Sequence, residues 1–192
     1  MNGRSPGALL LCLLPLACNP VQDLERFDVD GEQVVSIPGK NLVSDPLSVI
    51  PVDGIADNLS QSVSQSFENQ GVDTNDVDSF VAKSVTLEVL GPADRNGNLL
   101  QDLRFLDQVR FVLQAEGVAE AVVAESASDA FGVGVFRYDF VVDSNHNLKD
   151  FLAAPSMTLR VDATANDRPG LGCDLRFATT FTVDVNPAGL LD

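Results

Sequence analysis

The chain of 192 residues has no tryptophan, one tyrosine, one histidine and three cysteines. A zinc site or another transition-metal site takes several histidine or cysteine ligands, so His146 and one free thiol do not suffice. A Ser–His–Asp triad would have to use the same histidine. Sugar-binding sites commonly stack their ligand on aromatic side chains, and the single Tyr138 disfavours glycosidases and lectins.

Basic residues are also scarce. The chain has 12 Lys and Arg against 28 Asp and Glu, a formal net charge of −16. A surface of this sign repels the phosphates of nucleic acids and anionic lipid headgroups, whereas it attracts cations and basic partners. We therefore expect no nucleic-acid partner, and the composition leaves the protein or glycan partner open.

No apolar run approaches the roughly 20 residues that span a bilayer as a helix. The longest, Ala8 to Ala17, is interrupted by Pro15, and Arg4 is the only charge before Asp23. A positive start, a short apolar stretch and a small residue at its end are typical of a secretory signal. We predict a signal peptide at residues 1–17.

Pro15-Leu16-Ala17-Cys18 resembles the lipobox of bacterial lipoproteins, in which the cysteine is diacylated and becomes the first residue. Pro15 stands where that family usually has Leu, and Leu16 is large for its position. The resemblance implies a lipid on Cys18, a lipidated tether at residues 18–25 and export to the outer membrane or the periplasmic face of the cell envelope; Asn19 after the cysteine favours the outer membrane. An ordinary secretory signal and an apolar N-terminal helix of a cytosolic protein are the alternatives.

The three cysteines fit this resemblance. Cys12 leaves with the signal peptide and Cys18 carries the lipid, so Cys173 alone remains and no internal disulfide is possible. A lone cysteine is more often a small packed apolar side chain than a nucleophile. A catalytic pair would have to join Cys173 to His146.

Apolar residues alternate with polar ones through most of residues 26–192, which is typical of strands with one buried face. Asp30-Gly31 predicts a turn between two short strands, Phe27–Val29 and Val34–Ile37. An apolar residue at every fourth position predicts an amphipathic helix near Ile55 to Asn69, ended by Gly71. A second helix of one or two turns is predicted within 148–154, and further strands at 81–90, 109–115, 118–124, 136–142, 157–164 and 175–185.

These segments predict one mainly β domain at 26–192, an antiparallel β-sandwich of the immunoglobulin-like or jelly-roll-like kind. The helix at 55–69 is expected to cover one end of a sheet, with a partner-binding face as the alternative. Long helices between the strands are absent, which argues against a doubly wound α/β fold.

Calcium is the one metal that an acidic sandwich suggests. Asp94, Asn96 and Asn98 alternate as calcium ligands do, but Leu99 and Phe105 stand where an EF-hand loop has Gly and Glu. The clusters at 143–147 and 28–31 fail similar tests. We interpret all three as turns, because Asp, Asn and Gly are favoured there.

The sequence therefore predicts a lipid-anchored protein of the cell envelope with a non-enzymatic binding or structural β-sandwich and no cofactor. One alternative is a calcium-dependent adhesion or carbohydrate-binding module, with Asp94, Asn96 and Asn98 as its candidate ligands. The other is an envelope hydrolase that uses Asp and Glu, which requires buried carboxyl groups of raised pKa.

Overall fold

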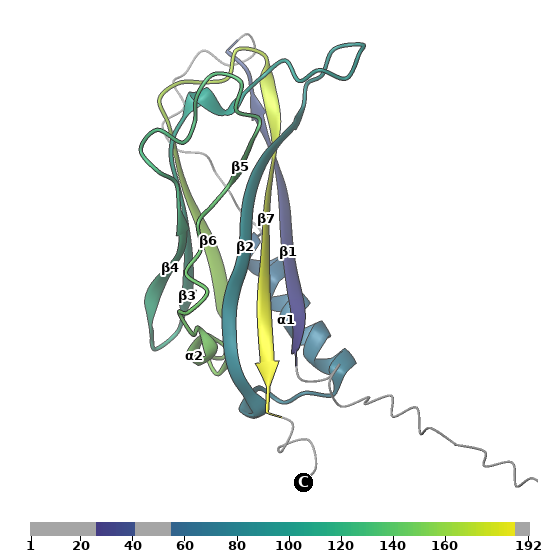
Figure 1. Ribbon diagram of the computed structural model, residues 1–192, viewed down its shortest axis with the longest axis vertical. Coiled ribbons are helices and arrows are strands. Elements are labelled where there is room, and N and C mark those ends of the chain that lie inside the picture. Colours follow the sequence, from purple (N-terminus) through teal and green to yellow (C-terminus); the bar gives the residue numbers. More distant parts are fainter. Residues whose placement is uncertain (1–25, 41–54, 187–192) are drawn as a thin grey trace, which may run out of the picture.

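The computed structural model describes residues 26–40 and 55–186. The predicted signal peptide, Cys18 and the tether lie outside these residues. The chain forms two antiparallel sheets, a four-stranded one in the order β1-β7-β2-β5 and a three-stranded one in the order β4-β3-β6 (Figure 1). The strands are β1 Arg26–Pro38, β2 Val77–Gly91, β3 Leu106–Ala115, β4 Val118–Glu125, β5 Arg137–Asp139, β6 Met157–Ala165 and β7 Gly172–Val185.

The two sheets pack their apolar faces together, which confirms the predicted mainly β sandwich. Along β7, Leu175, Phe177, Thr179 and Phe181 are buried, while Arg176, Ala178 and Thr180 between them lie half-buried. The rings of Phe177 on β7 and Phe111 on β3 have centroids 6.2 Å apart. The alternation of apolar and polar residues along the strands thus corresponds to one core between the two sheets.

The turn predicted at Asp30-Gly31 is wrong, because β1 continues through it. Asp30 pairs with Thr180 and Gly31 with Thr179 in an unbroken ladder. A Cβ on Gly31 would lie 3.0 Å from Thr179 Oγ1 and 3.5 Å from Leu59 Cδ1. Gly31 therefore serves close packing inside a strand, where the helix crosses it.

The predicted amphipathic helix is confirmed as α1, Ile55–Gln70. Leu59, Val63 and Phe67 are buried, and the helix packs on β1 and on β6, the edge strands on one side of the sandwich. Gly71 follows with φ +65°, as the residue after a helix often does. The apolar stripe of α1 thus packs against the core, as expected for a helix that covers the sandwich.

The other side of the sandwich is crossed by residues 136–148. The strand predicted at 136–142 is shorter than expected, because only β5 forms a ladder with β2. One hydrogen bond lies on each side of this ladder: Val89 N donates to the Phe136 carbonyl (2.8 Å), and Phe140 N donates to the Val85 carbonyl (2.9 Å). The chain then leaves β2 for β4, where Val142 bridges Ala124, and the short predicted helix follows as α2, Lys149–Leu152.

Candidate functional site

The sandwich has two distinct ends. At one of them, Arg26 starts β1 and pairs with Asp184, so β1 begins where β7 finishes. At the loop end, Pro38 pairs with Gly172, and the loops 92–102, 126–136 and 166–171 gather there (Figure 1). Thirteen residues of β1 separate the ends, a length of about 43 Å.

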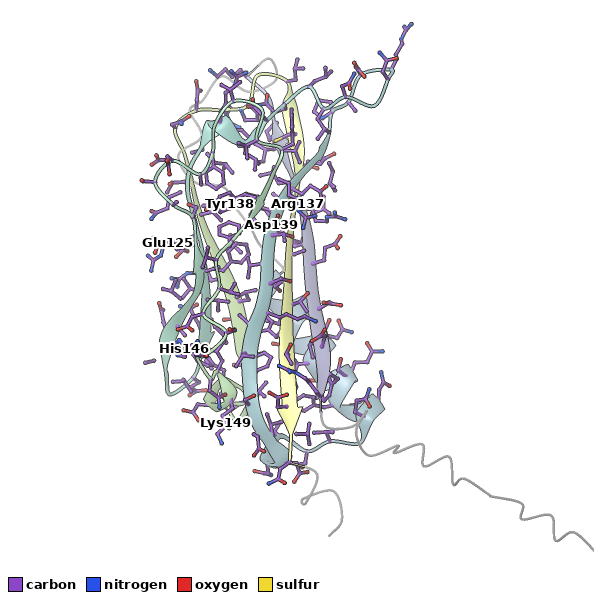
Figure 2. All side chains as sticks on the ribbon, in the orientation of Figure 1. Glu125, Arg137, Tyr138, Asp139, His146 and Lys149 are labelled. Carbon is purple, nitrogen blue, oxygen red and sulfur yellow. The ribbon has the colours of Figure 1, made fainter. Side chains whose placement is uncertain are left out.

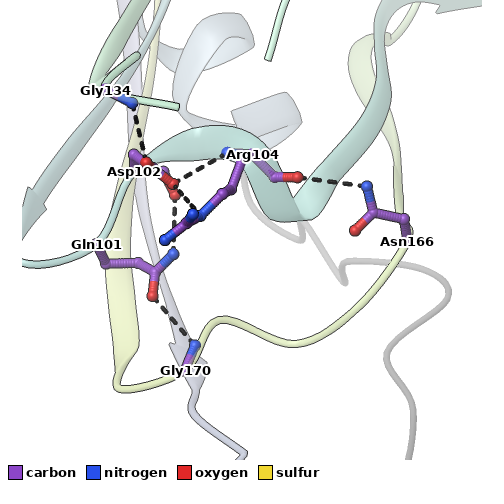
Figure 3. A network of polar contacts seen from close by, with 6 residues as sticks. All are labelled: Gln101, Asp102, Arg104, Gly134, Asn166 and Gly170. Atoms are coloured by element: carbon purple, nitrogen blue, oxygen red, sulfur yellow. Dashed lines mark hydrogen bonds and ion pairs between the residues drawn. The ribbon is translucent and has the colours of Figure 1, made fainter. Parts of the chain in front are cut away.

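A buried carboxylate organises the loop end. Only 8% of the Asp102 side chain is exposed, and it lies beside the short 3-10 helix Leu103–Phe105. Its Oδ1 accepts a bond from Arg104 N (3.4 Å) and pairs with Arg104 Nε (3.1 Å). Its Oδ2 accepts a bond from Gly134 N (3.0 Å), so one carboxylate joins two loops (Figure 3).

Gln101 extends this network to a third loop. Its amide nitrogen donates to the Asp102 carbonyl (3.0 Å), and its amide oxygen accepts from Gly170 N (3.1 Å). On the other side, the Asn166 side chain donates to the Arg104 carbonyl (3.3 Å). A buried polar side chain is costly unless it is bonded, and here each bond holds a loop in place.

A cleft of about 430 Å³ opens beside the network. Lys40, Arg104 and Arg168 line it together with Asp167, an unusual gathering of cations on a chain of charge −16. The Arg104 side chain is 61% exposed, and in the described part of the chain its ion pair uses Nε alone. The Lys40 ammonium donates a hydrogen bond to the Asp167 carboxylate and so lowers the pKa of that group. Leu171, also in the lining, is 55% exposed.

Asp94, Asn96 and Asn98 form a turn in the hairpin that projects from the loop end, and the turn interpretation is confirmed there. Asp94 Oδ1 accepts from Asn96 N (2.8 Å) and Asn98 N (2.9 Å), while Oδ2 accepts from the Asn98 side chain (2.9 Å). These bonds lower the Asp94 pKa, the side-chain bond from Asn98 most. Within residues 26–40 and 55–186, no three His, Cys, Asp or Glu side chains are grouped so that they could hold a metal ion.

Of the two other predicted turns, one is confirmed and one is wrong. Residues 143–147 do form one, and the Asn147 side chain then bonds both Phe80 N (3.1 Å) and the Asp78 carbonyl (3.0 Å). Residues 28–31 belong to β1, as described above. Asp28 on that strand accepts bonds from Lys83 (2.5 Å) and Thr182 (2.8 Å), which lower its pKa.

Cys173 and His146 are not brought together. Cys173 is buried near the start of β7, and burial, with a smaller contribution from Asp174, raises its pKa to about 12. His146 lies in the exposed loop that bonds Phe80, whereas the residue after Cys173 pairs with Gly91 at the far end of β2. Phe80 and Gly91 are eleven positions apart along β2, which corresponds to about 35 Å. Cys173 is therefore a packed side chain.

Sequence reasoning missed Gln101, Asp102 and Arg104. The available signal was a polar pair inside the apolar run 99–106, Leu-Leu-Gln-Asp-Leu-Arg-Phe-Leu. An acidic residue at such a place is almost never buried without partners. Besides Arg104, however, Asp102 bonds Gly134, 32 positions away, and Gln101 bonds Gly170, 69 positions away in the chain.

No protein-family model matches the chain, and neither does any curated protein or solved structure. No helix in the described part of the chain is long and apolar enough to cross a membrane.

Proposed function

We propose that the protein is a lipid-anchored component of the cell envelope whose β-sandwich binds or supports a partner without catalysis. The observation that carries this proposal is that the loop end lies opposite the end at which β1 begins. Arg26, at that end, directly follows the predicted tether 18–25, which reaches at most about 28 Å. The loop end lies about 43 Å further along β1, so a lipid on Cys18 would present it away from the membrane.

The loop end is the surface on which we expect the partner. Loops held on a rigid sandwich are common places for binding. The cleft there offers the exposed guanidinium of Arg104, whose unused nitrogens suit a carboxylate or phosphate group. The ion pair with Asp102 fixes the orientation of that guanidinium before a ligand arrives.

The anchor is tested with Cys18→Ser. Two acyl chains hold a protein stably on a membrane, and serine provides no thiol for the thioether. We expect the variant to lose its labelled fatty acid and to move from the membrane fraction to the soluble fraction. Cys12→Ser is the matched control, since it changes a leader cysteine outside the lipobox and should stay membrane-bound. Equal membrane fractions for Cys18→Ser and the wild type would refute the anchor.

The calcium-dependent alternative makes a prediction of its own. An ion bound only to the native state at about 100 times its Kd would add roughly 2.7 kcal/mol, which raises the melting temperature by several degrees. Because both Asp94 oxygens already accept bonds within their own turn, we expect no shift between excess calcium and excess chelator. Differential scanning calorimetry measures it, and a rise of several degrees in calcium would favour the alternative.

No observation favours the hydrolase alternative. A general acid at neutral pH needs a carboxyl group whose pKa is raised by burial. Asp28, Asp94 and Asp167 instead have lowered pKa values, because lysine, threonine, asparagine or backbone groups donate to their charged forms.

A further inference from the structure

The edge strand β4 is open along half its length. Ala124 near its end bridges Val142, and beyond that bridge the described part of the chain pairs nothing else with its outer edge. The same crossing segment seals β2 closely, since Leu148 N donates to the Phe80 carbonyl (2.7 Å) and Asn147 bonds Phe80 N. One edge of the sandwich is thus closed by this segment, and the other is left as a seam.

The seam is a cleft of about 660 Å³ between residues 117–121 and residues 146–151. The β4 side runs for five residues, or about 17 Å, which matches one short extended segment. His146, labelled in Figure 2, lies on the opposite wall, toward the end of the sandwich where β1 begins. The seam is therefore separate from the cleft at the loop end and does not depend on the function proposed for it.

The outer edge of β4 lacks Lys and Pro, two residues that commonly protect edge strands, although it has Glu120 and Glu125 and two register shifts in its pairing with β3. Natural edge strands are commonly blocked by Lys or Pro, which discourages another strand from pairing. β4 reads Val-Ala-Glu-Ala-Val-Val-Ala-Glu and has neither residue. The small side chains of Ala119 and Ala121 leave room for another backbone to approach.

The acidic residues of the seam favour a basic segment as its occupant. Glu120 and Asp150 line it, and among the described residues no Lys or Arg does. Glu120 Oε1 accepts bonds from Gln114 on the neighbouring strand β3 and from Arg160 on β6, the strand beyond it. Within the described part of the chain its Oε2 makes no bond. Opposite charges across paired strands attract, and the net charge of −16 adds a long-range pull on cations. Phe151 and Ala121, both buried, offer apolar contact below the rim.

From this geometry we propose that the seam binds an extended segment of a partner protein by strand addition to β4, and that this segment alternates basic with apolar residues. The added strand would take main-chain bonds from residues 118–122 and place its basic side chains near Glu120. A second copy of this chain is disfavoured as the occupant, because pairing β4 with β4 would bring two acidic strands and two molecules of charge −16 together.

The test uses the full-length protein and a fluorescent hexapeptide, Lys-Val-Lys-Val-Lys-Val, followed by fluorescence anisotropy. We expect saturable binding, and at least about tenfold weaker binding when alternate backbone nitrogens are methylated, since methylation removes strand hydrogen bonds but keeps the charges. The peptide with Glu in place of Lys should not bind. Hydrogen exchange should slow at residues 118–122 when the basic peptide is present.

Glu120→Gln should weaken binding of the basic peptide by about threefold while leaving the melting temperature close to that of the wild type. Asp129→Asn is the matched control, because it removes one exposed charge from the loop 126–136 at the other end and should change nothing. Equal binding of the methylated peptide, unchanged exchange at 118–122, or a peptide-free dimer protected at β4 would each overturn the proposal.

Discussion

Gly172→Ala should lower the free energy of unfolding by about 3 kcal/mol, a large share of the stability of a single domain. Gly172 has φ +84°, where an L-residue costs roughly 1–2 kcal/mol. A Cβ there would also lie 2.8 Å from Gly39 N and 2.9 Å from the Ile37 carbonyl oxygen. Both atoms are backbone, so β1 and β7 would have to move apart at the loop end, at a further cost of about 1–3 kcal/mol.

Gly97→Ala separates the two causes. Gly97 has nearly the same φ, +86°, but nothing lies within 4 Å of the position of its Cβ. Chemical denaturation of both variants should show Gly97→Ala losing only the conformational part, about 1–2 kcal/mol. If the two variants lost equal stability, the close approach of Gly39 and Ile37 would contribute nothing, and our account of this contact would be wrong.

Alternation along single strands predicted most of the fold. Val85, Leu87 and Val89 are buried as their spacing indicates, because one face of each sheet faces the core and every second residue must be apolar. The helix α1 was equally readable, since its stripe has to be covered by something. In both cases the spacing of apolar residues is a local pattern, and the buried face runs along the whole element.

Errors arose where a contact from another part of the chain decides the local structure. Gly31 looked like a turn residue beside Asp30, yet it is small because Leu59 of α1 packs on it. The strand at 136–142 is cut short because Val142 leaves β2 to bridge Ala124. A local pattern contains neither the helix nor the second sheet, so it could not show either outcome.

The candidate site was missed for the same reason. Asp94, Asn96 and Asn98 attracted attention because their spacing imitates a ligand loop, and they bond one another within five residues. Asp102 has one local partner, Arg104, but its bond to Gly134 joins a different loop. The loop end can be identified only when β1, β2 and β7 are placed side by side.

Asp102→Ala should cost about 2–3 kcal/mol, because it removes hydrogen bonds to a charged group from a nearly buried position. Gly134 N and Arg104 Nε would both lose their acceptor. Asp102→Asn keeps the shape and one acceptor oxygen, so it should lose about half as much. Thermal and chemical unfolding measure both variants.

Asp129→Ala provides the comparison for the loss of an exposed acid in the same region. Its carboxylate makes no ion pair in the described part of the chain, and we expect a change within about 0.5 kcal/mol. Hydrogen exchange adds a local readout: Gly134 N should exchange faster in Asp102→Ala, since it donates to the Asp102 carboxylate. Gly170 N should stay protected, because Gln101 holds it and bonds the Asp102 main-chain carbonyl, which alanine keeps. If Asp102→Ala unfolded like Asp129→Ala and left Gly134 N protected, the loops would be held by their own packing. The cleft beside Arg104 would then be shaped without its buried carboxylate.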